Sequence, residues 1–310
     1  LGYVSGDFSV TGDSLMPDVA SPPASRVKTI GMIGLGLMGT AMTERFLEHG
    51  YAVRIWNRSK DKADPLLPLG AVWSDNPLAE CDRVIISLYT TPVVEEVLEQ
   101  LKAGLHPDQI LIDTTTGEPE QSMALAERLA QLGVKYLDAP ISGSSEQTRR
   151  GEATVLVGGG RETFDACADL WAIMGQRVFP VGAVGSAAKM KLVSNLVLGL
   201  NRAALAEALI YAETIGVDPT AALEVLKGSM AYSKVMDVKG RKMLERDYSV
   251  QARLSQHLKD VRLILQTASQ QGVELPLSAV HRELLETAEK KGFGQQDNCS
   301  VIEAWRGKSS

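Results

Sequence analysis

The chain reads Gly34-Leu35-Gly36-Leu37-Met38-Gly39 between a short apolar run at residues 27–33 and an amphipathic helical pattern at Met38–Glu48. This spacing matches G-x-G-x-x-G, a motif that gains specificity when a strand precedes it and a helix follows it. The glycines of such a loop permit a tight turn, close approach of the backbone to a pyrophosphate, and close helix–strand packing. We therefore predict a dinucleotide-binding unit here, with phosphates at the helix N-terminus.

Short β-branched runs alternate with helical stretches from residue 27 to about residue 181. The expected strands are Val27–Ile33, Ala52–Trp56, Arg83–Leu88, Gln109–Asp113, Tyr136–Asp138 and Thr154–Val157, and the expected helices are Met38–Glu48, Pro92–Leu101 and Glu118–Leu132. Such alternation predicts a parallel sheet with helices on both faces. The fold class is therefore α/β, with a Rossmann-type doubly wound sheet in residues 26–188.

The pattern changes after residue 188, where helical periodicity continues without a convincing strand. One long helix is expected from Lys191 to about Ile215. Further helices are expected at Pro219–Lys227, Ser233–Arg246, Ser255–Gln271 and Pro276–Lys291. Residues 189–310 are therefore predicted to form an all-α C-terminal domain for substrate binding and oligomerisation. The long interdomain helix would carry Lys191 at the junction, where ligand sites are common.

The composition excludes several classes of protein. The net charge of −6 argues against a nucleic-acid surface or a basic membrane patch. No apolar run approaches the roughly 20 residues of a membrane span. The three cysteines, Cys81, Cys167 and Cys299, are far apart, and no set of His, Cys and Asp has metal-ligand spacing. We expect no metal, and reduced thiols typical of a cytoplasmic protein.

Residues 1–25 contain Gly, Ser, Asp and Pro without periodicity, so we interpret them as a tail outside the fold. The segment lacks the basic and apolar regions of a signal peptide. It also has too many acidic residues and too little Arg for an organelle transit peptide. The expected location is therefore cytoplasmic.

The end of the second expected strand bears on the choice of cofactor. An NAD enzyme carries Asp or Glu about 20 residues after the glycine loop, but this strand ends in Ile55-Trp56-Asn57-Arg58-Ser59-Lys60. Arg58 and Ser59 suit a 2′-phosphate by charge and hydrogen bonding, so we predict NADP(H) over NAD(H). The residues expected to contact the cofactor are Gly34, Gly36, Leu37, Met38, Gly39, Asn57, Arg58, Ser59 and Leu88.

Lys191 and Asn195 follow a glycine turn and stand four positions apart, which puts both on one face of a helix. There the ammonium can protonate a carbonyl oxygen while the amide positions its neighbours. The turn Ser142-Gly143 follows a strand and can offer a hydroxyl and backbone N–H groups to a carboxylate. We predict Lys191, Asn195 and Ser142 as catalytic residues. Lys189 points away from the face of Lys191 and is expected in solvent.

Four separated motifs between residues 29 and 304 resemble those of the β-hydroxyacid dehydrogenase family. This family includes 3-hydroxyisobutyrate dehydrogenase, tartronate semialdehyde reductase and plant-type glyoxylate/succinic semialdehyde reductase. The motifs are the glycine loop, Asp138–Ser144 (similar to D-A-P-x-S-G), Gly182–Asn195 (similar to G-x-G-x-x-x-K-x-x-N-N) and Leu258-Lys259-Asp260 (similar to K-D-L). Because they lie far apart in the chain, the resemblance is specific.

The resemblance implies roles for individual residues. Lys191 resembles the catalytic acid/base, and Asp260 resembles a partner near that lysine. Thr116 and Lys259 resemble cofactor contacts. The substrate-binding residues implied in this way are Ser142, Gly143, Ser144, Lys191, Asn195 and Asp260.

The chain departs from the family pattern at four positions. Ala187 replaces a glycine before the lysine, and Ser194 replaces the first of two asparagines. Ser144 replaces a glycine, and Ala252 replaces an aromatic residue, which could enlarge the pocket. These departures do not affect the hydride chemistry. They concern the identity of the substrate.

The predicted function is the reversible, NADPH-dependent reduction of a small carboxylate-bearing aldehyde or ketone to the hydroxyacid. Lys191 would act as general acid/base with a lowered pKa. One alternative is an imine reductase of the same architecture, which usually carries Asp or Tyr in place of this lysine. Another alternative is a non-catalytic, dehydrogenase-like module that only binds nucleotide. Such modules have lost the lysine, which is present in this chain as Lys191. A decarboxylating 6-phosphogluconate dehydrogenase is disfavoured by the shorter C-terminal region.

The expected partners follow from this function and from the long helix. They are a small carboxylated substrate and further copies of the chain, in a homodimer or homotetramer formed through the apolar stripe of that helix. No nucleic acid and no membrane is expected as a partner.

Overall fold

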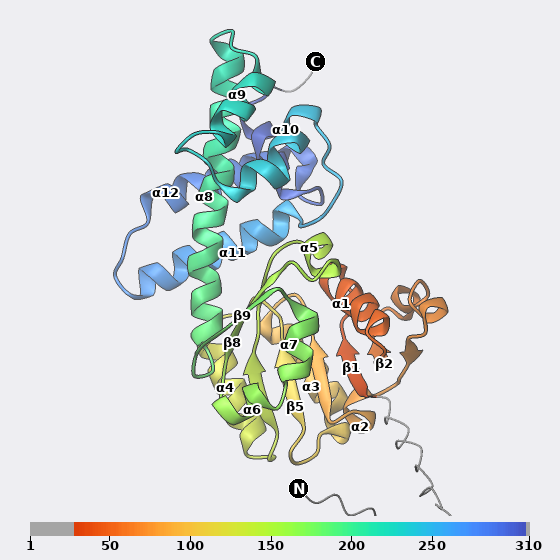
Figure 1. Ribbon diagram of the computed structural model, residues 1–310. Coiled ribbons are helices and arrows are strands. Elements are labelled where there is room, and N and C mark those ends of the chain that lie inside the picture. Colours follow the sequence, from red (N-terminus) through yellow and green to blue (C-terminus); the bar gives the residue numbers. More distant parts are fainter. Residues whose placement is uncertain (1–27, 308–310) are drawn as a thin grey trace, which may run out of the picture.

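The computed structural model describes residues 28–307, so the predicted tail at residues 1–25 lies outside the described residues. A sheet with helices on both faces is followed by helices grouped around the long helix α8 (Figure 1). The strands are β1 (Thr29–Ile33), β2 (Ala52–Trp56), β3 (Val72–Trp73), β4 (Arg83–Ile86), β5 (Ile110–Asp113), β6 (Lys135–Asp138), β7 (Ile141–Ser142), β8 (Thr154–Gly158) and β9 (Arg177–Gly182). The α-helices are α1 (Leu37–Glu48), α2 (Pro77–Glu80), α3 (Thr91–Leu101), α4 (Pro119–Ala130), α5 (Ser145–Arg149), α6 (Arg161–Asp165), α7 (Ala168–Met174), α8 (Ser186–Thr214), α9 (Pro219–Lys227), α10 (Arg241–Glu245), α11 (Leu254–Gln270) and α12 (Pro276–Ala288). The predicted fold class is confirmed.

The sheet has the order β3-β2-β1-β4-β5-β6-β8-β7, with β9 beside β8. Strands β1 to β6 pair in parallel, as predicted. The expectation of a wholly parallel sheet is wrong, because β8 pairs antiparallel with both β6 and β7. Between β6 and β8 the chain forms the short strand β7 and a helix of only five residues, α5. That is too little for the crossover helix that a parallel return requires.

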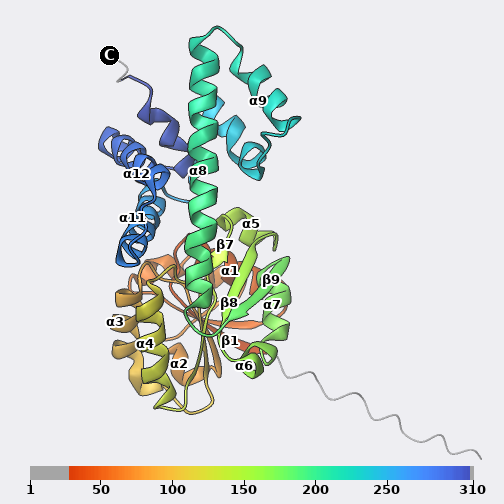
Figure 2. The ribbon, with the colours of Figure 1, turned by 90° about the vertical axis from the view of Figure 1, so that its left-hand side faces the viewer.

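Hydrophobic cores lie on both faces of the sheet. One face packs against α1 and α7, where Phe46 and Trp171 are buried, and the other packs against α3 and α4, where Leu98 is buried (Figure 2). Neighbouring side chains of β1 belong to different cores, Met32 to the first and Ile33 to the second. Burial on both sides explains why these strands read as continuous apolar runs.

Helix α8 connects the sheet to the C-terminal helices (Figures 1 and 2). It begins at Ser186, five residues before Lys191, and its first part packs against β8 and β9. The carboxylate of Asp138, at the end of β6, accepts a hydrogen bond of 2.9 Å from the backbone N–H of Ala188. This bond anchors the positive end of the helix to the sheet. The domain boundary that we place at residues 188 and 189 falls within the first turn of α8 and stays a prediction.

Helix α8 departs from the expectation that no segment could span a membrane. By length and composition it is apolar enough to do so, with a mean hydropathy of 1.3 over an 18-residue window. A buried helix of a globular protein passes the same test, but only 39% of this window of α8 is buried. Since α8 buries Lys191, Asn195 and Arg202 against other parts of the chain, and ionisable groups facing lipid are costly, we interpret it as a helix that packs into the fold along one face.

Candidate active site

A cavity of about 540 Å³ lies where the glycine loop, the segments after β4 and β5, and helices α8 and α11 meet. Ligands of open α/β sheets bind at this carboxyl edge. Of the predicted cofactor contacts, the cavity wall includes Gly34, Gly36, Leu37, Met38, Asn57, Leu88 and Thr116. Of the predicted substrate and catalytic residues, it includes Gly143, Lys191, Asn195 and Asp260. Gly39, Arg58, Ser59, Ser142, Ser144 and Lys259 lie outside that wall.

The glycine loop has a geometry that fits a dinucleotide. Gly34 has a φ of 100°, in the left-handed region that favours glycine. A Cβ on Gly39 would lie 1.8 Å from the carbonyl oxygen of Gly34, so α1 packs directly against the loop. A Cβ on Gly36, in contrast, would meet nothing within 4 Å. The N-terminus of α1 has no side-chain cap, and this open space with free N–H groups suits a pyrophosphate.

The segment after β2 holds the residues predicted to select the cofactor. The Oδ1 atom of Asn57 accepts a hydrogen bond of 3.0 Å from the backbone N–H of Leu35, and its Nδ2 donates to the carbonyl oxygen of Ser59 at 2.9 Å. The side chain of Arg58 is 74% exposed and lies 3.9 Å from Glu96. An exposed ion pair of this kind is weak, so the guanidinium is free to turn toward a phosphate.

Lys191 and Asn195 lie on the inner face of α8, and both side chains line the cavity. Lys191 is only 6% exposed. Burial lowers the pKa of Lys191 to about 8; the ammonium of Lys259 acts in the same direction, and the carboxylate of Asp260 opposes both. A group with this pKa can give and accept a proton near neutral pH. Lys189 is exposed, as predicted.

Asp260, on α11, connects Asn195 of α8 to Lys259, its own neighbour in the sequence. Its Oδ2 accepts a hydrogen bond of 2.9 Å from Nδ2 of Asn195. Its Oδ1 lies 3.0 Å from Nζ of Lys259. The bond to Asn195 sets the orientation of that amide and leaves its Oδ1 to accept from another donor in the cavity.

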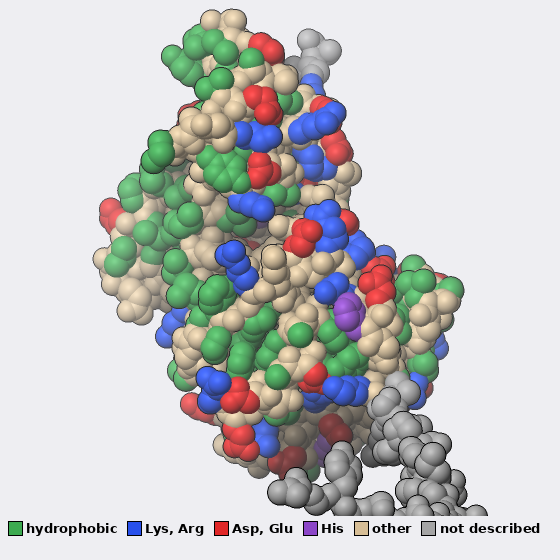
Figure 3. Space-filling model, in the orientation of Figure 1, with side chains coloured by type: hydrophobic (Ala, Val, Ile, Leu, Met, Phe, Trp, Pro, Cys, Tyr) green, Lys and Arg blue, Asp and Glu red, His purple; other side chains and the backbone are tan. Residues whose placement is uncertain are grey.

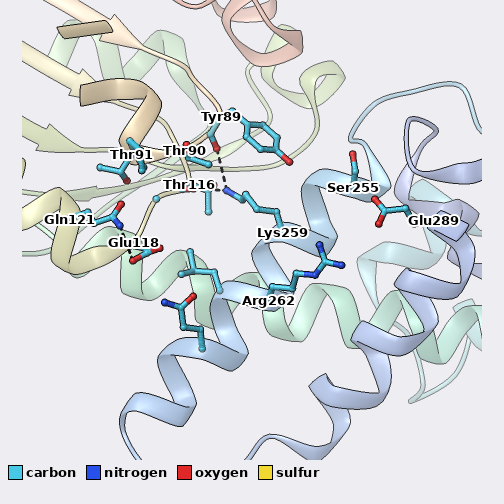
Figure 4. A pocket seen from close by; sticks show the side chains of 14 residues that line it. Tyr89, Thr90, Thr91, Thr116, Glu118, Gln121, Ser255, Lys259, Arg262 and Glu289 are labelled. Atoms are coloured by element: carbon cyan, nitrogen blue, oxygen red, sulfur yellow. Dashed lines mark hydrogen bonds between the residues drawn. The ribbon is translucent and has the colours of Figure 1, made fainter. Parts of the chain in front are cut away.

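Lys259 bridges the two parts of the chain (Figure 4). Its Nζ donates to the carbonyl oxygens of Thr116 at 2.7 Å and Tyr89 at 3.3 Å. Lys259 lines a smaller hollow of about 330 Å³ beside the main cavity, whereas Thr116 lines both. Lys259 therefore ties α11 to the loops that follow β4 and β5.

The predicted carboxylate-binding turn lies between β7 and α5. Gly143 lines the cavity, and Ser142 is half-buried next to it. Ser144 is the N-cap of α5: its hydroxyl accepts from the N–H of Gln147 at 3.2 Å, and its own N–H donates to Oε1 of Gln147 at 2.9 Å. This capping box gives a structural reason for serine in place of the family's glycine.

The cavity wall contains residues that sequence reasoning missed. They include Leu198, Arg202, His257 and Asn298. Helical spacing could have found two of them, because Leu198 and Arg202 continue the face that bears Lys191. Ala252 also lines the cavity, so the departure from the family's aromatic residue changes the lining of the pocket.

The loop, the sheet edge and the buried lysine meet in one cavity, and together they define a nicotinamide-dependent oxidoreductase. Residues 29–182 match a family model described as the NAD binding domain of 6-phosphogluconate dehydrogenase. Residues 185–305 match one described as NAD-binding of NADP-dependent 3-hydroxyisobutyrate dehydrogenase. The chain belongs to the β-hydroxyacid dehydrogenase family, as its motifs predict.

Two curated relatives cover most of the chain. Glyoxylate/succinic semialdehyde reductase 2, chloroplastic, of Arabidopsis thaliana is 30% identical over 288 residues, which are 91% of this chain and 80% of that protein. The 2-hydroxy-3-oxopropionate reductase of Escherichia coli is 32% identical over 282 residues, which are 89% of this chain and 96% of that protein.

Solved structures share the architecture. The 3-hydroxyisobutyrate dehydrogenase of Salmonella typhimurium matches with a TM-score of 0.82 at 23% identity, over 90% of this chain and all of that one (100%). An imine reductase from Pseudomonas sp. matches with a TM-score of 0.63 at 22% identity, over 90% of this chain and 99% of that one. At these identities the matches show the fold, and they do not distinguish the two chemistries.

Proposed function

We propose that this chain is an NADPH-dependent oxidoreductase that reversibly reduces a small carboxylate-bearing aldehyde or ketone to the hydroxyacid. The observation that carries the proposal is the ammonium of Lys191, which is buried in the cavity that the glycine loop lines and makes no hydrogen bond to any described side chain. A buried charge opposes folding, and a perturbed group in a cleft is a candidate for function. The names of the relatives support the substrate class.

Lys191 supplies the proton in this mechanism. In reduction its ammonium donates a proton to the carbonyl oxygen as negative charge develops there. NADPH, when bound, supplies the hydride. In oxidation the neutral amine of Lys191 accepts the hydroxyl proton. Asn195, held by Asp260, positions the substrate, and the turn at Ser142-Gly143 binds its carboxylate through a hydroxyl and backbone N–H groups.

A substrate panel tests this proposal through NADPH consumption. The compounds are glyoxylate, succinic semialdehyde, tartronate semialdehyde, methylmalonate semialdehyde and a cyclic imine. We expect turnover of at least one carboxylated carbonyl compound. Turnover of the imine alone would replace the proposal with an imine reductase. Binding of NADPH without turnover of any compound would favour the non-catalytic module.

We further propose that Arg58 selects NADPH by contacting its 2′-phosphate. Arg58→Ala should lower kcat/KM for NADPH by at least about tenfold, the value of a lost charge-assisted hydrogen bond. The kcat/KM for NADH should stay at the wild-type value, because NADH lacks that phosphate. Initial rates with each cofactor measure the ratio, and Arg161→Ala, at a remote exposed arginine, is the control. An unchanged ratio in Arg58→Ala would contradict this selection.

The pKa of Lys191 predicts opposite pH profiles for the two directions. Reduction requires the ammonium, so kcat/KM for the carbonyl substrate should be level below a pH of about 8 and fall above it. Oxidation requires the neutral amine, so kcat/KM for the hydroxyacid should rise with pH and level off above about 8. Initial rates in both directions measure the profiles. Inflections that point the same way in both directions would be incompatible with one shared acid/base.

We also propose that copies of the chain associate as a homodimer or homotetramer through the outer face of α8. Hydrophobic side chains gather on the side of the molecule where α8 and α12 lie (Figure 3). The exposed ones include Val193, Val197 and Tyr211 on α8 and Leu277 and Val280 on α12. Large exposed apolar surfaces mark interaction sites, and sedimentation velocity measures the state of association.

A further inference from the structure

Arg202 lies on the inner face of α8, about three turns beyond Lys191. The strip formed by Lys191, Asn195, Leu198 and Arg202 runs along the cavity wall. Arg202 is only 3% exposed. A step of 11 positions along the helix, from 191 to 202, separates the two Cα atoms by about 16 Å. The side chain of Arg202 forms part of the cavity wall, next to His257 and Asn298 in the same lining.

The guanidinium of Arg202 has no hydrogen-bond partner among residues 28–307 at two of its three nitrogens. Its Nε and Nη1 atoms are buried without any hydrogen bond. The carboxylate that attracts it most is Asp297, whose oxygens already accept from Nζ of Lys239 at 2.7 Å and from three backbone N–H groups, those of Gln251, Ala252 and Cys299. Burial lowers the pKa of Arg202 to about 10. An uncompensated buried charge is strongly destabilising. Arg202 therefore lowers the stability of the folded protein, and a bound anion would remove this effect.

The polar groups around Arg202 leave its charge uncompensated. His257 and His281 pack against Gly199, where a Cβ would lie 2.5 Å from an atom of each ring. Burial, with the adjacent charge of Arg202, holds the pKa of both histidines below the usual range, so they are neutral at physiological pH. The Nε2 atoms of both histidines and Oδ1 of Asn298 are buried without hydrogen bonds. Arg202 therefore lies among neutral groups without hydrogen bonds, of which His257 and Asn298 line the cavity with it and His281 does not.

We propose that Arg202 binds a second carboxylate of the substrate, so that the preferred substrates are dicarboxylates. One carboxylate would lie at Ser142-Gly143 beside the reacting carbon, and the other would lie at the end of a short chain. The inference rests on the proposed function for the place of the reacting carbon. A carboxylate matches the fork of a guanidinium and its single charge. A phosphate carries nearly two charges, one of which Arg202 would leave uncompensated.

Oxidation of a homologous series tests the second carboxylate. The monoacid is 3-hydroxy-2-methylpropanoate, and the diacids are 2-(hydroxymethyl) derivatives of butanedioate, pentanedioate and hexanedioate. At least one diacid should exceed the monoacid in kcat/KM by about tenfold or more, as expected for a charge-assisted hydrogen bond. Arg202→Met should bring that ratio close to one, and Arg202→Lys should give an intermediate ratio. A monoacid equal to or better than every diacid, or an unchanged ratio in Arg202→Met, would overturn the inference.

A binding measurement separates this inference from the proposed function. Glutarate and butanoate are compared for their effect on the Tm of the NADP⁺-loaded protein. Glutarate should raise the Tm of the wild type more than butanoate does, and Arg202→Met should lose the difference. Arg241→Met is the control, because Arg241 is an exposed arginine on α10. If no hydroxyacid is oxidised but the glutarate effect depends on Arg202, the proposed function fails and the anion site stands; if glutarate acts equally on Arg202→Met, the anion site fails.

Discussion

Lys191→Ala is expected to lower kcat by about 10²–10⁴-fold, the range that a positioned acid/base contributes, while the Kd of NADPH changes little. The loss arises because no other described side chain places an ammonium on the inner face of α8 at this level of the cavity. The glycine loop and Asn57 hold their positions without Lys191, since none of their hydrogen bonds involves it. Steady-state kinetics and fluorescence titration with NADPH measure the two quantities.

Lys189→Ala is the matched control for this experiment. Lys189 is on the same helix turn but is exposed, so its replacement should leave kcat at the wild-type value. A Lys191→Ala variant that retains more than about a tenth of the turnover would be inconsistent with acid/base catalysis.

Lys191→Met should also raise stability, which a structural lysine would not do. The pKa of Lys191 falls from 10.5 to about 8 on folding, a difference of about 2.5 units, or about 3 kcal/mol. Because the folded pKa lies below the unfolded one, this cost is fully present below a pH of about 8 and disappears as the pH rises toward 10.5. At neutral pH the Tm of Lys191→Met should therefore rise while its turnover collapses. A lowered Tm would show that Lys191 stabilises the fold.

Gly36→Val is expected to weaken NADPH binding by at least about 100-fold, the scale on which small displacements at a site act. The new side chain would enter open space, since a Cβ on Gly36 meets nothing within 4 Å. That space is where the backbone must approach the pyrophosphate. The fold should tolerate the change, so the Tm of the free protein should stay within a few degrees of wild type. Fluorescence titration and thermal unfolding measure the two effects.

Gly39→Ala provides the contrast within the same loop. A Cβ on Gly39 would lie 1.8 Å from the carbonyl oxygen of Gly34, so α1 would have to move away from the sheet. We expect a loss of about 3 kcal/mol or more in the free energy of unfolding, at or above the usual cost of overpacking. If Gly36→Val unfolded the protein while Gly39→Ala did not, the assignment of the two glycines would be reversed.

Local patterns predicted most of the fold. Strands β1, β2, β4 and β5 and helices α1, α3 and α4 follow the expected positions, because each is a clear apolar or periodic segment of ordinary length. The short elements β3 and α2, of two and four residues, were not predicted. The pattern did not predict that β8 would run antiparallel. Strand direction depends on the length and path of the connection between β6 and β8, and the apolar run of β8 reads the same in either direction.

The candidate site was predicted in part. Lys191 and Asn195 could be paired from their spacing alone, since i and i+4 share a helix face. Arg58 and Ser59 follow β2, as the sequence predicts, but both are exposed and lie outside the cavity wall. Ser144 could be aligned with the carboxylate-binding turn, yet its polar groups are engaged by Gln147.

The sequence by itself determined the dinucleotide loop, the alternation of the main strands and helices, and the pairing of Lys191 with Asn195 on one helix face, because each depends on the spacing of a few neighbouring residues. Only the tertiary structure decided that Asp260 holds Asn195, that Lys259 bonds to loops more than 100 residues away, and that Arg202 is buried with nitrogens that lack partners. The physical reason is that burial and pairing depend on which distant segments pack together. A local sequence pattern shows which charged residues are present. It cannot show which of these residues lack a partner of opposite charge in the folded chain.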